Sequence, residues 1–112
     1  MNVVFLPEVQ EYYGYLEQIL YEKGYFGSME YSQKYVKELI EDIKTNLPIK
    51  QHNPAPKHFD KYGKGLYYAS FNKNKQTTWY AFFNKYEVNK EIIYLIRYIA
   101  NNHTAAQYLE VS

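Results

Sequence analysis

The sequence has 112 residues, of which 46% are hydrophobic and 22% charged, and this composition predicts a single globular domain over residues 1–112. It has no cysteine, no basic and apolar leader and no long apolar run, so we expect a cytoplasmic protein without disulfides, thiolate chemistry or membrane contacts. The net charge is +1, but residues 50–112 carry +5, which favours an anionic partner or simply solvated lysines in turns.

The N-terminal half of the chain is expected to form one strand and two helices. The apolar run at 2–6 predicts a short strand, and Pro7 suits the first turn of a helix. Apolar side chains at three- and four-residue spacing over 9–20 predict that this helix is amphipathic. Ser28 is the expected N-cap of a second helix that stops at Pro48. The short connection between the two helices predicts an antiparallel hairpin.

The C-terminal half follows a long connection at 48–65 that is rich in proline and glycine. A period of two then predicts three antiparallel strands, at 66–71, 77–84 and 91–99, with turns at 72–76, 86–90 and 101–103. Thr104 is the expected cap of a short last helix. The predicted fold class is α+β: an N-terminal strand, a two-helix antiparallel hairpin, a three-stranded antiparallel sheet and a short C-terminal helix. We expect the helices to cover one sheet face and the other to stay free for a partner.

Common catalytic signatures are absent from the sequence. There is no glycine-rich phosphate loop and no serine in a nucleophile elbow. His52 and His58 are not at helical ligand spacing, and no cysteine or carboxylate pair completes a ligand set. We therefore expect neither a metal nor a cofactor.

Five segments in chain order carry a family resemblance. They are Phe-Leu-Pro-Glu at 5–8, Tyr-Val-Lys-Glu-Leu-Ile at 35–40, Lys-Gly-Leu-Tyr-Tyr at 64–68, Thr-Thr-Trp-Tyr-Ala-Phe-Phe at 77–83 and Tyr-Leu-Ile-Arg-Tyr-Ile-Ala-Asn-Asn-His at 94–103. In order and spacing they resemble the RelE/ParE superfamily of toxins from bacterial type II toxin–antitoxin modules, in particular the RelE-like or HigB-like branch. The resemblance implies an endonuclease that cleaves mRNA on the ribosome and is neutralised by a cognate antitoxin.

The same resemblance implies a catalytic set around the last strand. RNA cleavage needs an activated 2′-hydroxyl, a stabilised phosphate charge and a protonated leaving oxygen. The positions that match are His103 as general acid or base, Tyr108 to orient or stack on a base, and Arg97 to hold phosphate. The alternatives are a capping role for His103 and an ion pair of Arg97 with Glu91 or a helix carboxylate.

A second set of residues is predicted to bind RNA or a protein partner. Its members are Lys57, Lys61, Lys64, Lys73, Lys75, Tyr67 and Asn102. Lysines in loops also serve solubility, and asparagines form turns, so these alternatives remain open.

The sequence departs from the family at several positions. Tyr67 and Ala69 stand where the family has catalytic lysines, and Thr78 or Trp79 stands where it has an arginine. The hypotheses therefore include a ParE-like inhibitor of DNA gyrase, a degenerate protein-binding module and a generic RNA-binding domain. Endoribonuclease activity is the leading hypothesis, with the antitoxin, the ribosome and mRNA as partners.

Overall fold

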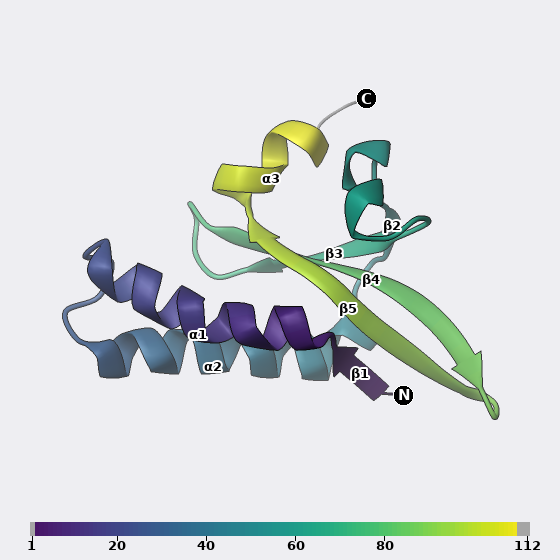
Figure 1. The fold of residues 1–112 in the computed structure, drawn as a ribbon, viewed down its shortest axis with the longest axis horizontal. Helices are drawn as coiled ribbons and strands as arrows, with labels where there is room; N and C mark the ends of the chain where they lie inside the picture. Colours follow the sequence, from purple (N-terminus) through teal and green to yellow (C-terminus); the bar gives the residue numbers. More distant parts are fainter. Residues whose placement is uncertain (1, 110–112) are drawn as a thin grey trace.

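The computed structural model describes residues 2–109, which form one mixed sheet with helices on both faces (Figure 1). The elements are β1 (Asn2–Phe5), α1 (Pro7–Glu22), α2 (Met29–Asn46), the 3-10 helix η1 (Leu47–Ile49), β2 (Asn53–Pro54), the 3-10 helix η2 (Lys57–Tyr62), β3 (Tyr67–Asn72), β4 (Thr78–Val88), β5 (Glu91–Asn101) and α3 (Asn102–Leu109). The α+β class is therefore confirmed.

The three expected antiparallel strands are confirmed as β3, β4 and β5, but they belong to a sheet of five strands in the order β1-β5-β4-β3-β2, so the expected number of strands in the sheet is wrong. Strand β1 runs parallel to β5, with Phe5 opposite Ile96, and the Leu6 N–H donates to the Ile96 carbonyl at 3.1 Å. The two-residue strand β2 adds to the other edge, antiparallel to β3. A strand of two residues has no periodicity to detect, and the partner of β1 depends on tertiary packing.

The expected turn at 86–90 is present but shorter, and the expected turn at 101–103 is wrong. Strand β4 continues to Val88, and Asn89 and Lys90 form a two-residue turn with φ of 51° and 68°, which is typical of tight hairpins. Strand β5 continues to Asn101, and α3 begins at once with Asn102. Thr104 is therefore inside the helix rather than its cap.

The helix hairpin follows the sequence pattern closely. The Ser28 hydroxyl oxygen accepts a hydrogen bond from the Tyr31 N–H at 3.3 Å, so the expected N-cap is confirmed. Helix α2 ends at Asn46, just before Pro48. No helix within residues 2–109 is long and apolar enough to cross a bilayer.

The main core lies between this hairpin and one face of the sheet. The helices contribute a buried stripe that packs on the inward side chains of the strands. Its buried members include Val9, Leu16, Val36, Leu39, Ile43, Phe71, Trp79, Phe83 and Ile96.

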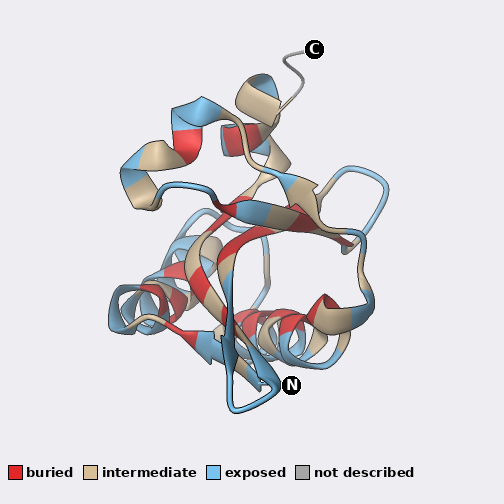
Figure 2. Cartoon of the chain, turned by 90° about the vertical axis from the view of Figure 1, so that its right-hand side faces the viewer, coloured by how far each residue is buried: buried red, intermediate tan, exposed pale blue. Residues whose placement is uncertain are grey.

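The opposite sheet face is partly covered, so the expectation of a free face is wrong. Phe59 from η2 and Ala105 from α3 are buried against Phe82 and Ala100 of the sheet, forming a second small core. Figure 2 shows buried segments in the layer of η2 and α3, at the top, as well as in the helix hairpin below the sheet. What remains open on this face is the gap between η2 and α3.

Candidate functional site

A cavity of about 370 Å³ lies between η2 and α3, and we call it the η2–α3 cleft. Its titratable lining residues come from three elements: His58, Lys61 and Tyr62 from η2, Tyr98 from β5, and His103 and Tyr108 from α3. Among residues 2–109, no aspartate or glutamate lines the cleft. Its charge therefore complements an anionic ligand.

Buried apolar anchors hold the two walls of this cleft on the sheet. The Phe59 ring is 2% exposed and stacks on Phe82, with ring centroids 4.3 Å apart. Ala105 is buried in the same cluster. Because Phe59 and Ala105 point into the sheet, their neighbours on η2 and α3 are left around the opening.

Two stacked aromatic pairs cross the cleft. The rings of His58 and Tyr108 are 3.5 Å apart and nearly parallel, with an interplanar angle of 4°. The rings of Tyr62 and Tyr98 are 3.8 Å apart at 6°. Burial, with a further contribution from Tyr62, raises the pKa of Tyr98 above its ordinary value, so its hydroxyl stays protonated and able to donate. The stacked pairs place flat aromatic rings beside the cleft.

Two histidines and one lysine lie around the cleft. Histidine exchanges protons near neutral pH, and both His58 and His103 are exposed at the cleft. Lys61 adds a fixed positive charge. The His103 side chain makes no hydrogen bond within residues 2–109, so the structure gives no support to the alternative in which it caps a helix.

Arg97 lies in an adjoining hollow of about 200 Å³ whose lining shares Tyr62 and Tyr98 with the cleft. It is the extra residue of a β-bulge, since Phe82 pairs with Tyr98 and Phe83 with Ile96. Bulges redirect side chains and are frequent beside active sites.

The partners of Arg97 are neutral. Its Nε donates to the Asn84 side chain, and its Nη2 donates to the Tyr86 hydroxyl at 3.3 Å. No carboxylate of residues 2–109 lies within 4.0 Å of the guanidinium, so the expected ion pair with Glu91 or a helix carboxylate is wrong. Glu8 also lines this hollow, but it forms no ion pair with Arg97.

The remaining predicted binding residues are dispersed. Lys57 is exposed at the start of η2, near the cleft, whereas Lys64 and Lys75 are exposed in other turns. Lys73 lies over the Tyr35 ring at 5.0 Å and 4.0 Å from the Glu38 carboxylate, on the helix side of the sheet.

Two other predicted residues have structural contacts. Tyr67 lies on the side of β3 that faces the α1–α2 hairpin, with the Lys85 ammonium 4.6 Å from its ring. The Asn102 Oδ1 accepts from the Thr78 N–H at 3.1 Å, and its Nδ2 donates to the Gln76 carbonyl at 3.1 Å. Asn102 therefore ties the start of α3 to the start of β4.

His58, Tyr62 and Tyr98 are site residues that sequence reasoning missed. His58 was considered only as a metal ligand, and it faces the cleft because its neighbour Phe59 points into the sheet. The six-residue 3-10 helix that carries it has no periodicity long enough to detect.

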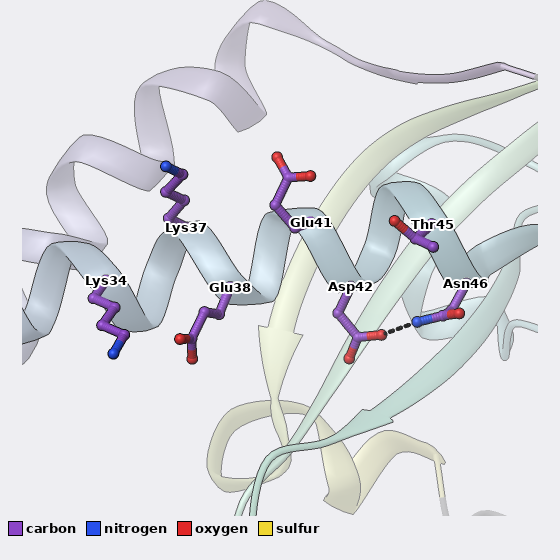
Figure 3. Close-up of a pocket in the computed structure, with 7 residues that line it drawn as sticks. All are labelled: Lys34, Lys37, Glu38, Glu41, Asp42, Thr45 and Asn46. Atoms are coloured by element: carbon purple, nitrogen blue, oxygen red, sulfur yellow. Dashed lines mark hydrogen bonds between the residues drawn. The ribbon is translucent and has the colours of Figure 1, made fainter.

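A hollow of about 510 Å³ on the outer surface of α2 carries no comparable arrangement (Figure 3). All seven lining residues belong to this one helix, and its two lysines are followed by three acidic residues, with side chains that fan outward in Figure 3. The hydrogen bond drawn there joins Asn46 to Asp42 at 2.6 Å. This pattern is typical of a solvated helix surface.

No protein-family model, curated protein or solved structure matches this chain. The chemistry of the site is therefore argued from its geometry and charge. The η2–α3 cleft, with the adjoining Arg97, is the candidate functional site.

Proposed function

We propose that this protein is the toxin of a bacterial type II toxin–antitoxin module and cleaves mRNA at the η2–α3 cleft, in association with the ribosome. The observation that carries the proposal is the convergence of His58, His103 and Lys61 around a cleft that no carboxylate of the described residues lines. The basic C-terminal part of the chain adds support, and so does the guanidinium of Arg97, which forms no ion pair within residues 2–109.

The element order supports the same proposal. The chain runs strand, helix hairpin, three-strand antiparallel meander and helix, which is the order that the RelE/ParE resemblance implies. The parallel β1 and the short β2 extend this sheet at its two edges.

The proposed chemistry is an intramolecular transesterification at a phosphodiester of the RNA. The 2′-oxygen attacks the adjacent phosphorus while the bond from phosphorus to the 5′-oxygen breaks. One neutral histidine takes the proton of the 2′-hydroxyl, and the other, as imidazolium, gives a proton to the 5′-oxygen. The products are a 2′,3′-cyclic phosphate and a 5′-hydroxyl.

The surrounding side chains fit the remaining tasks. Lys61 and Arg97 stabilise the charge that develops on the phosphate oxygens. The flat Tyr62–Tyr98 and His58–Tyr108 pairs offer ring faces beside the reacting nucleotides. The cognate antitoxin is expected to present acidic side chains to the cleft, because the part of its lining that the structure describes carries cations and neutral groups.

Induced expression in bacterial cells tests the proposal. We expect wild-type expression to arrest growth, and separate His103→Ala, Arg97→Ala and Tyr108→Ala variants to relieve the arrest. Lys34→Ala, on the solvated surface of α2, is the control and should remain toxic. Harmless expression of folded wild-type protein contradicts toxin function.

A non-catalytic role is the second candidate, either DNA gyrase inhibition or binding of another protein. The observation in its favour is a group of exposed aromatic side chains on the helix hairpin, including Tyr15, Tyr25 and Tyr31. Growth arrest that survives all three alanine variants favours this role over RNA cleavage.

A further inference from the structure

A second cavity, of about 420 Å³, lies on the other side of His103, and we call it the aromatic pocket. It is bounded by the end of α1, the α1–α2 loop and the adjoining ends of β4 and β5. His103 and Thr104 line both the aromatic pocket and the η2–α3 cleft. The two hollows therefore meet at the first turn of α3.

The walls of the aromatic pocket are built from rings held in place. Tyr25, Phe26, Tyr35 and Trp79 all line it. The Trp79 Nε1–H donates to the Tyr35 hydroxyl oxygen at 2.9 Å, and the Phe26 and Tyr35 rings are 5.2 Å apart. The Tyr35 hydroxyl has no acceptor of its own within residues 2–109, so it is free to donate to a ligand.

The charge of the aromatic pocket is one-sided. Lys23 and His103 line it, whereas no aspartate or glutamate of the described range 2–109 does. Lys23 has no ion-pair partner within residues 2–109. Aromatic walls with cations at one side suit a planar base attached to a phosphate, and the volume is that of a small-ligand site.

We propose that the aromatic pocket binds an unstacked base of single-stranded RNA, next to the phosphate that is cleaved in the η2–α3 cleft. The RNA strand then crosses His103, with the base on one side and the reacting phosphate on the other. This inference rests on the proposed function and adds a base-binding subsite, which makes single-stranded RNA the substrate class.

The test is binding of a short, fluorescein-labelled 2′-O-methyl oligoribonucleotide, which lacks the attacking 2′-hydroxyl and so reports binding without cleavage. Fluorescence anisotropy gives the affinity. The emission of Trp79 gives a local signal, because it is the only tryptophan of the sequence. Binding to the wild type is expected to change this emission.

Two exposed side chains of the pocket can be changed with little risk to folding. We expect Tyr25→Ala and Lys23→Gln each to weaken binding by about tenfold, through lost stacking and lost phosphate contact. The matched control is Tyr15→Ala, because Tyr15 and Tyr25 are both 67% exposed but Tyr15 does not line the pocket. The control should bind as the wild type does.

The outcomes separate this inference from the proposed function. Binding that depends on Tyr25 and Lys23, without cleavage of natural RNA, supports the subsite and contradicts the nuclease proposal. The subsite alone is overturned if cleavage depends on His58 and His103 while changes at Tyr25 and Lys23 alter neither oligonucleotide binding nor cleavage. Absence of oligonucleotide binding, or binding with unchanged Trp79 emission, also overturns the subsite and leaves the pocket to a peptide.

Discussion

The imidazole of His58 lies flat on the phenol ring of Tyr108, with centroids 3.5 Å apart and an interplanar angle of 4°. His58 belongs to η2 and Tyr108 to α3, so this stack joins the two walls of the η2–α3 cleft directly. Both elements otherwise rest on the sheet through small buried clusters. The stack therefore sets the width of the cleft and the position of one proposed acid–base group.

Removing the Tyr108 ring is predicted to loosen this wall. Tyr108→Ala should lower the free energy of unfolding by about 1 kcal/mol, because offset or stacked aromatic pairs contribute about that much. Urea denaturation measures the change. Tyr108→Phe keeps the ring and is expected to retain most of the stability, so equal losses in the two variants argue against the stack as the cause.

Gly63 is predicted to be required where the chain leaves η2. Its φ is 149°, and a Cβ added there would lie 2.8 Å from Arg97 Cδ. Gly63→Ala should therefore destabilise the fold by about 1–3 kcal/mol and displace Arg97. Chemical denaturation measures the stability, and RNA affinity reports the displacement.

Gly14 is the matched control for this substitution. It lies inside α1, and an added Cβ would meet nothing within 4 Å. Gly14→Ala should stabilise the protein by about 1 kcal/mol through helix propensity. If Gly63→Ala and Gly14→Ala changed the free energy of unfolding in the same direction, this would contradict the close approach of Arg97 to Gly63.

The hydroxyls of Tyr13 and Tyr35 are predicted to respond oppositely to removal. The Tyr13 hydroxyl is buried without a hydrogen-bond partner in residues 2–109, so Tyr13→Phe should raise the unfolding free energy by about 1 kcal/mol. The Tyr35 hydroxyl accepts from Trp79, so Tyr35→Phe should lower it by about the same amount. Thermal denaturation of both variants measures these changes in unfolding free energy. If both variants are less stable than the wild type, the Tyr13 hydroxyl has a hydrogen-bond partner in solution.

Stability is predicted to fall at alkaline pH. Burial raises the pKa values of Tyr12, Tyr13 and Tyr98 above their ordinary value of 10.0. As pH rises above 10, the unfolded chain releases these protons while the folded chain keeps them, so the unfolding free energy decreases. Thermal unfolding from about pH 8 to pH 11 measures this slope. The decrease of stability with pH should be shallower in Tyr13→Phe. An unchanged slope would argue against a contribution from Tyr13.

The local patterns in the sequence were sufficient for the helix hairpin. Helical periodicity and the Ser28 cap act within a few residues, so both could be predicted. The bulge at Arg97 and the two edge strands depend on pairing between distant residues. Periodicity carries no information about such pairing, and the extent of the sheet was therefore missed.

The site was predictable only in part for the same reason. The resemblance led to His103, Tyr108 and Arg97, and the fold brings these three to the η2–α3 cleft or the hollow beside it. His58 reaches the cleft because η2 packs on the sheet through Phe59, which is a tertiary event. Asn102 looked available in sequence, but its side-chain amide is occupied by the backbone of β4 and its preceding turn.

RNA cleavage by the purified protein is the most direct test of the central claim. Single-stranded RNA, free or bound to translating ribosomes, is incubated with the wild type and with His58→Gln and His103→Gln, and the product ends are analysed. We predict fragments with 2′,3′-cyclic phosphate and 5′-hydroxyl ends, and rates about 100-fold or more lower in each variant. Undetectable cleavage by folded wild-type protein on both substrates, or equal rates in all three proteins, would contradict the assignment of the η2–α3 cleft as a nuclease site.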